Sequence, residues 1–307
     1  KMVHNVAQTI IEGFLHYATS ITISFKAKTF KNAFYAIFVA TGITDTASLF
    51  TCCFLRLNRE LGLGEEYRVV LLSCYIFSGS AFIAHLLGET LITINRYSAL
   101  CLLNKYDLIW TKKNVWAAVV IQYIVSFAVF AHTIGVEMIY VRTSDGSVIY
   151  KGIDKGTDVI IRSTYFIASM IYATIGICIN TRILIEWRRL RKIDGCLKDR
   201  HHDTGLLLYA LVAYICSMLV CAQQLTKAIA VNASMDELSV WASMQYFWIY
   251  DVMVSAPPFS LLLLSSDLRQ EKLNSFRQNA NQSVMTISVT APSARKTVDR
   301  RTQSMCI

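Results

Sequence analysis

Eight of the ionisable side chains within or at the ends of long apolar stretches of this 307-residue chain are candidates for chemistry, because a charge there needs a partner or a hydrated cavity. Such a group costs roughly 2.5 to 3.5 kcal/mol near the centre of a bilayer. The eight are Glu12, Asp45, His85, Glu89, His132, Glu137, Arg162 and Asp251. Asp45 and Asp251 fall near the middles of their stretches, so we expect them to share a hydrated pocket. With Glu89 they form a predicted polar switch or ion site; an internal hydrogen-bonded pair that fixes packing is the alternative.

A second predicted site combines charges with aromatic rings near the ends of three stretches. Arg162 and Glu137 could form an ion pair or reach toward a ligand, and Arg162 could instead snorkel. Some of the rings in the last stretch are adjacent and cannot face the same way, so an interfacial belt explains only part of them. We predict a small-molecule pocket lined by Arg162, Glu137, Tyr246, Phe247, Trp248 and Tyr250.

Arg96 lies at the end of the third stretch, in the segment NRYSAL (residues 95–100), and KYDLIW (residues 105–110) follows it. An Arg at this place can reach across the mouth of a helical bundle or meet a partner outside the membrane. The predicted output surface consists of Arg96, Tyr97, Trp110, Arg188, Arg189, Arg191 and Lys192. A simple excess of positive charge beside the membrane, or contact of the basic run with anionic lipid, is the alternative.

Catalytic and metal-binding patterns are missing from the sequence. The histidines stand at positions 4, 16, 85, 132, 201 and 202, and no pair inside the apolar stretches has the i, i+4 spacing of a metal-binding helix. No glycine-rich phosphate loop or nucleophile motif occurs. We therefore expect no enzyme activity, no cofactor and no bound metal.

Seven apolar stretches position these groups, and each is about 20 residues long, enough for a helix to cross roughly 30 Å of hydrocarbon. The composition agrees, with 54% hydrophobic and only 17% charged residues. The stretches cover residues 7–25, 32–55, 69–94, 115–139, 159–185, 205–230 and 240–264. The expected fold is an all-α integral membrane protein, a bundle of seven transmembrane helices. Six spans are the alternative, because the first stretch contains Glu12 and His16.

Most of the 30 Lys and Arg residues lie in the first, third and fifth connections and after the last stretch. The positive-inside rule therefore places the N-terminus outside and the C-terminus in the cytoplasm. The net charge of +9 then reflects orientation and contact with membrane lipid rather than binding of nucleic acid.

The short connections predict one seven-transmembrane domain over residues 1–278. After the last stretch, Asp267 and Gln270 can cap a short amphipathic helix on the inner leaflet. Residues 279–307 are rich in Ser, Thr, Asn and Gln and are expected to form a disordered cytoplasmic tail. Among the nine cysteines, a bridge from Cys74 to Cys52 or Cys53 is the one disulfide that the expected topology allows.

The chain resembles the nematode serpentine chemoreceptors of the Srg superfamily, in the serpentine receptor class gamma or a close relative. The similarity is carried by FKNAFYAIFVATGITDTASLF (residues 30–50), TINRYSAL (93–100) with Trp110 downstream, and SAPPFSLLLLSSDLR (255–269). The resemblance implies a G-protein-coupled receptor in which Arg96 fills the place of the Arg that controls G-protein engagement. Asn95 stands where an acidic residue usually precedes that Arg, so the local salt bridge is missing.

The resemblance implies a chemosensory receptor in the plasma membrane of sensory neurons. It would bind an extracellular small-molecule ligand and signal through a heterotrimeric G protein. The alternative is a transporter or ligand-gated channel that uses Asp45, Glu89 and Asp251 as a polar pathway.

Overall fold

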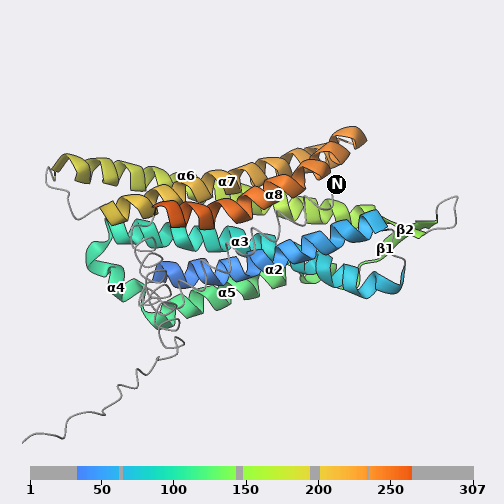
Figure 1. Ribbon diagram of the computed structural model, residues 1–307, viewed down its shortest axis with the longest axis horizontal. Helices are drawn as coiled ribbons and strands as arrows, with labels where there is room; N and C mark the ends of the chain where they lie inside the picture. Colours follow the sequence, from blue (N-terminus) through green and yellow to red (C-terminus); the bar gives the residue numbers. More distant parts are fainter. Residues whose placement is uncertain (1–32, 62–64, 143–147, 194–200, 234, 265–307) are drawn as a thin grey trace, which may run out of the picture.

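Six long helices run side by side in the computed structural model, which describes residues 33–61, 65–142, 148–193, 201–233 and 235–264 (Figure 1). They are α2 (Ala33–Leu61), α3 (Arg68–Cys101), α5 (Lys112–Phe130), α6 (Lys155–Ile193), α7 (His201–Asn232) and α8 (Asp236–Leu264). A short helix, α4 (Tyr106–Ile109), joins α3 to α5, and strands β1 (Met138–Arg142) and β2 (Val148–Ile153) join α5 to α6. The short helix and the hairpin mark opposite ends of the bundle, which we call the α4 end and the hairpin end (Figure 1).

Among the described residues, five helices are long and apolar enough to cross a membrane: α2, α3, α5, α6 and α7. The outer face of α5 exposes large apolar side chains such as Ile121 and Ile124, at 59% and 63% of their surface. A continuous exposed apolar face suits lipid rather than water. The expected first stretch at residues 7–25, the amphipathic helix after the last stretch and the tail at residues 279–307 lie outside the described residues.

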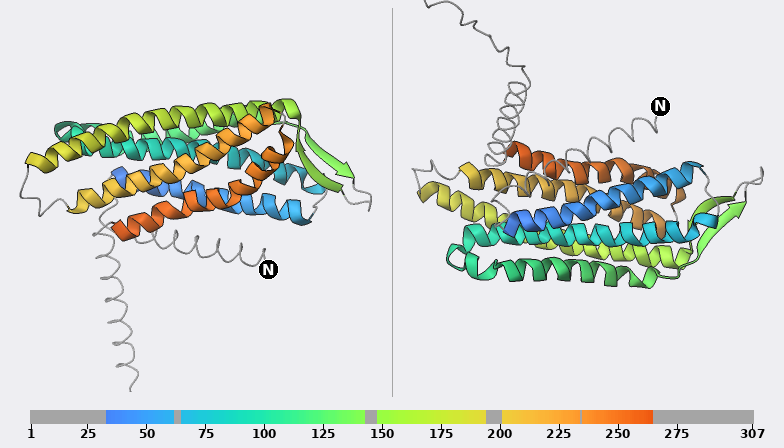
Figure 2. Two further views of the ribbon diagram at one scale, coloured as in Figure 1. Left: turned by 90° about the horizontal axis from the view of Figure 1, so that it is seen from above. Right: turned by 60° about the horizontal axis from the view of Figure 1, so that its bottom comes forward.

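Helix α3 occupies the centre of the bundle and packs against α2, α5, α6 and α7 (Figure 2). Two of its glycines allow this close packing. A Cβ atom at Gly79 would lie 2.7 Å from carbon atoms of the Phe130 ring, and one at Gly88 would lie 2.9 Å from Nε2 of Gln122. Real Cβ atoms do not approach other atoms so closely, so α5 can rest against α3 only because both side chains are absent.

Helices α5 and α6 each begin with a side-chain cap. Thr111 Oγ1 accepts a hydrogen bond from the backbone N–H of Asn114 (3.3 Å) at the start of α5. Asp154 Oδ2 accepts from the backbone N–H groups of Gly156 (3.0 Å) and Thr157 (3.2 Å) at the start of α6. Such caps satisfy donors that have no partner inside the helix.

The expected span at residues 115–139 is wrong at its second end, and the all-α expectation missed the hairpin. The helix ends at Phe130, a 3-10 turn covers Ala131–Thr133, and Gly135 adopts a φ of 87° that takes the backbone out of the helical region. Strand β1 then pairs antiparallel with β2. Apart from Glu137, residues 136–141 are apolar and rich in β-branched and aromatic types, so they extend the hydrophobic run of the helix while favouring a strand.

Candidate functional site

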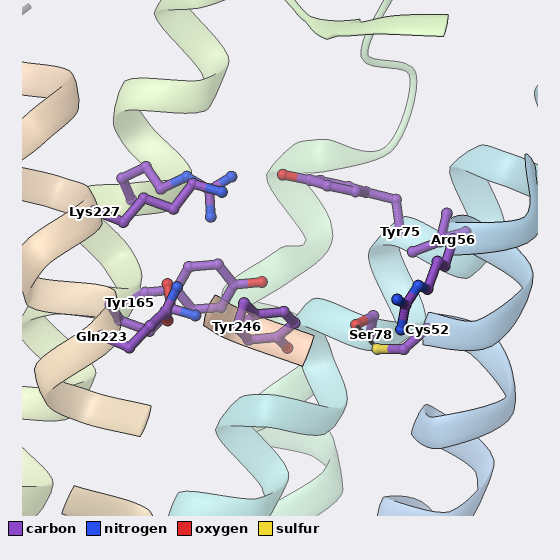
Figure 3. Close-up of a pocket in the computed structure, with 11 residues that line it drawn as sticks. Cys52, Arg56, Tyr75, Ser78, Tyr165, Gln223, Lys227 and Tyr246 are labelled. Carbon is purple, nitrogen blue, oxygen red and sulfur yellow. Dashed lines mark hydrogen bonds between the residues drawn. The ribbon is translucent and has the colours of Figure 1, made fainter. Parts of the chain in front are cut away.

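A cavity of about 170 Å³ lies near the hairpin end, between five helices. Its lining residues come from α2, α3, α6, α7 and α8: Cys52, Leu55, Arg56, Tyr75, Ser78, Arg162, Tyr165, Gln223, Gln224, Lys227 and Tyr246. Figure 3 shows Gln223 and Lys227 on one side of this space and Cys52, Arg56 and Ser78 on the other. The lining thus combines basic groups, hydroxyl and amide groups, and aromatic rings.

Arg162 is the most constrained cation of the cavity. Its Nη2 lies 3.1 Å from Asp158 Oδ1, one turn earlier on α6, and its side chain is 14% exposed. Its Cζ lies 5.9 Å from the centre of the Tyr165 ring. Among the described residues its buried Nε atom has no hydrogen-bond acceptor. Arg162 is therefore held in place by one carboxylate and one ring, and its Nε donor is not used by any described residue.

Tyrosine rings fix the walls of the cavity. The Tyr165 ring packs edge-to-face against Phe82, with ring centres 5.1 Å apart, and the Tyr246 ring lies 5.4 Å from Tyr250. Tyr250 is buried behind this wall and donates a hydrogen bond to Ser48 Oγ at 2.6 Å. Packing on both sides gives the cavity a defined shape.

The predicted small-molecule pocket overlaps this cavity in part. Arg162 and Tyr246 line it, and Tyr250 supports it from behind. Trp248 is exposed and bonds to Gln245 on its own helix. Glu137 is exposed in the segment before β1, and the ion pair of Arg162 is made with Asp158 rather than with Glu137. The side chain of Phe247 lies outside the described residues.

Several polar residues of the cavity were not predicted from the sequence, among them Arg56, Gln223, Gln224 and Lys227. The adjacent pair Gln223–Gln224 interrupts an apolar helix, and Lys227 follows one turn later. Both glutamines are buried, and Gln223 Nε2 donates to the backbone oxygen of Ala242 at 2.7 Å. This polar interruption was the signal that could have located the cavity.

A buried polar cluster lies nearer the middle of the bundle. His85 Nδ1 on α3 lies 2.9 Å from Asp45 Oδ2 on α2, and His85 Nε2 lies 3.2 Å from Ser217 Oγ on α7. Glu89, one turn along α3 from His85, is also buried, and its charge lies within range of His85. Asp45 and Glu89 of the predicted polar set therefore lie in one cluster around His85, whereas the expected neighbour of Asp45 was Asp251.

Asp251 does not share that cluster. It is half-buried on α8 and lies within electrostatic range of Arg56 and Cys53 on α2. Among the described contacts, none joins it to Asp45 or Glu89. The structure thus separates the residues of the predicted polar switch. Asp45 and Glu89 lie together near the middle of the bundle, whereas Asp251 lies closer to the cavity.

The described cysteines near the hairpin end, Cys52, Cys53 and Cys74, are free thiols, so the disulfide that the topology allowed is not formed. Cys52 Sγ instead lies 3.4 Å from Ser78 Oγ. Among the described residues no group of three His, Cys, Asp or Glu side chains is arranged to hold a metal ion.

At the α4 end, Arg96 is 7% exposed and packs over the ring of Phe34, with its Cζ 3.9 Å from the ring centre. The residues around it fasten α4 to α3. Asn95 Nδ2 donates to the Tyr106 hydroxyl at 3.1 Å, and Trp110 Nε1 donates to Ser98 Oγ at 2.6 Å. The NRYSAL segment and the following loop therefore form one packed unit.

The remaining residues of the predicted output surface also lie toward this end. Tyr97 is half-buried on α3. Arg188 and Arg189 are exposed near the end of α6, and Arg189 lies 3.9 Å from Glu186. The backbones of Arg191 and Lys192 continue α6, while their side chains lie outside the described residues.

Comparison with protein families gives a match over residues 13–278 to the serpentine type 7TM GPCR chemoreceptor Srv. Curated proteins give no significant match. The match covers most of the chain and includes the cavity, the central polar cluster and Arg96. It confirms the predicted serpentine chemoreceptor and multi-pass membrane protein; the predicted receptor class, gamma or a close relative, is not confirmed as gamma, because the matched family is Srv. The chain therefore belongs to the Srv family of serpentine seven-transmembrane G-protein-coupled chemoreceptors.

Proposed function

We propose that this chemoreceptor binds an extracellular small molecule in the cavity at the hairpin end and activates a heterotrimeric G protein at the α4 end. One observation carries the proposal: a cavity with polar and aromatic walls and a buried Arg96 lie toward opposite ends of the same central helix, α3. The plasma membrane of a sensory neuron is the proposed location.

The distribution of charge supports this orientation. Lys112 and Lys113 at the start of α5 and Arg188 and Arg189 near the end of α6 all lie toward the α4 end. The positive-inside bias favours a cytoplasmic position for that end. The basic end of α6 can also hold anionic lipid of the inner leaflet.

The cavity and the central cluster join the same helices. A bound molecule would touch α2, α3 and α7, and the contacts of His85 with Asp45 and Ser217 tie those three helices together farther along. If the bundle exists in a resting and an active arrangement, a ligand shifts the equilibrium between them only by the difference between its affinities for the two. The arrangement that it favours would release Arg96 from Phe34 toward the G protein.

Arg96→Ala tests the output half of this proposal. We expect it to reduce ligand-driven G-protein activation by more than about tenfold, within the usual range of coupling free energies, while surface expression stays intact. A cell line carrying a promiscuous G protein and a screened agonist provides the measurement. Lys112→Ala, which removes an exposed charge at the same end, should leave activation unchanged. Full activation by Arg96→Ala would refute the role of Arg96.

A transporter or channel is the second candidate, favoured by the buried carboxylates Asp45 and Glu89 on neighbouring helices. The position of Asp251 outside their cluster weakens a continuous polar pathway. Purified protein in proteoliposomes, without G protein, gives a direct test. Ion flux that disappears in Asp45→Asn would support the transporter and contradict the receptor proposal.

A further inference from the structure

We infer that the cavity at the hairpin end is built for a small organic anion, a carboxylate carried on an apolar body of about the size of benzene. The inference rests on the proposed function and names the chemical class of its ligand. Its basis is the charge, the unused hydrogen-bonding groups and the size of the cavity.

The cavity wall is cationic. Arg56, Arg162 and Lys227 all line it, and no Asp or Glu is among its described lining residues. The carboxylates that lie close by, Asp158 and Asp251, are associated with Arg162 and Arg56 respectively, and neither lines the cavity. A ligand that enters therefore meets guanidinium and ammonium groups and no carboxylate of this described set.

The location of these cations runs against the general distribution of charge in the chain. Basic residues are concentrated toward the α4 end, yet these three lie near the opposite end and converge on one space from α2, α6 and α7. Positive charges that face one space from three helices attract an anion into it and disfavour a cation. An orientation signal alone does not require that these charges converge.

Arg162 offers the most specific contact. Asp158 occupies its Nη2 atom, and its buried Nε has no acceptor among the described residues. Charge-assisted hydrogen bonds from a guanidinium to a carboxylate are about twice as strong as neutral ones. Because Asp158 also fixes the side chain, little conformational entropy is left to lose when the anion binds.

The rest of the lining selects the body of the ligand. Tyr75, Tyr165 and Tyr246 present rings, and Leu55 and Cys52 add apolar surface. The volume of about 170 Å³ is close to that of an engineered apolar cavity of about 150 Å³ that binds benzene. This size favours a single small ring or a short aliphatic chain over a nucleotide or a peptide.

Two amide oxygens give the cavity a second, neutral polar side. Gln223 Oε1 and Gln224 Oε1 are buried and have no donor among the described residues. A hydroxyl group on the far side of the ligand would satisfy one of them. A hydroxylated carboxylate should therefore bind more tightly than its unsubstituted parent.

Binding of matched acids and amides to the purified full-length receptor in nanodiscs tests this inference. The probes are acetate, butyrate, benzoate and 4-hydroxybenzoate, each compared with its neutral amide by calorimetry or by thermal shift. We expect at least one acid of benzene size to bind about tenfold or more tightly than its amide, as a charge-assisted contact predicts. Arg162→Gln and Lys227→Gln should each remove most of that preference.

Lys155→Gln is the matched control, because it removes an exposed positive charge at the hairpin end outside the cavity. It should leave the preference for the acid unchanged. If no acid binds better than its amide, or if Arg162→Gln and Lys227→Gln both keep the preference, the inference is overturned. Binding of a neutral probe in the cavity would still allow the proposed receptor function, whereas acid binding without G-protein activation would refute the receptor function alone.

Discussion

The hairpin end and the α4 end of the bundle use the same kind of side chain in opposite ways. At the hairpin end Arg162 is fixed by Asp158 and lines a cavity, and its buried Nε atom has no acceptor among the described residues. At the α4 end Arg96 is stacked on Phe34 within the helix packing. The first arrangement is open to a small molecule without rearrangement, while the second requires helix movement before a partner can touch the guanidinium.

This difference is what the proposed function requires of a receptor in its resting arrangement, in which the proposed input site is preformed and the proposed output site is covered. The central cluster of Asp45, His85 and Ser217 lies between them and connects three helices. Changes in the cluster, at the α4 end and in the α4 loop therefore test how far the two ends depend on each other.

Asp45→Leu should have the largest effect. It removes the acceptor from His85, and a buried polar group without its partner costs about 1 to 3 kcal/mol. We expect the free energy of unfolding in detergent micelles to fall by about 2 kcal/mol, and agonist binding to lose its coupling to G-protein activation. Denaturant titration and an activation assay on the same preparations measure the two quantities.

Two variants serve as references for that result. Asp45→Asn keeps an oxygen acceptor for His85 and should lose less stability than Asp45→Leu. Asp251→Leu removes a half-buried carboxylate outside the cluster and should also lose less. Equal losses for Asp45→Leu and Asp251→Leu would show that the cluster has no special role in joining the two ends.

The helical framework was largely predictable because each span must be long and apolar to cross a bilayer. Five expected spans coincide with α2, α3, α6, α7 and α8 over most of their lengths. The hairpin was missed because residues 131–139 continue the apolar run of α5. Hydropathy alone does not distinguish an apolar strand from another turn of helix, and the turn at Gly135 depends on a backbone angle.

The candidate site was predictable only where a residue type is unusual in a membrane. Arg162, Asp45 and Glu89 were identified because charges are rare inside spans, and their roles stay predictions. Gln223 and Gln224 were missed because a neutral amide inside a span is a weaker sequence signal than a charge. Their burial also depends on the rotation of α7 about its axis. The contact of Arg96 with Phe34 joins two helices, so it depends on packing that a single sequence does not specify.

Phe34→Leu should have an intermediate effect and should act on the α4 end alone. The ring contact with Arg96 is worth about 0.5 to 2 kcal/mol, so its loss should raise basal G-protein activation by about two- to thirtyfold. Basal signalling normalised to surface expression measures this change. Phe38→Leu, one turn farther along α2, removes a buried ring without removing the Phe34 contact and should leave basal signalling near that of the parent protein.

The affinity for the agonist should respond to the same substitution differently from basal signalling. If the hairpin end is preformed, Phe34→Leu should change agonist affinity far less than it changes basal activity. A matched rise in affinity would mean that the cavity is shaped by the same movement that frees Arg96, and the contrast between a preformed input and a covered output would fail.

Trp110→Phe should have the smallest effect, because it removes one hydrogen bond and keeps most of the ring. The indole N–H donates to Ser98 Oγ at 2.6 Å, and a bond of this kind contributes about 1 kcal/mol. We expect amide hydrogen exchange in α4 to accelerate about fivefold, since local opening would cost that much less. Trp116→Phe, on the lipid-facing side of α5 where the ring is 45% exposed, should leave α4 exchange unchanged. Unaltered exchange in Trp110→Phe would mean that Asn95 and Tyr106 alone hold the loop, and the packed α4 end would then depend on one polar contact rather than two.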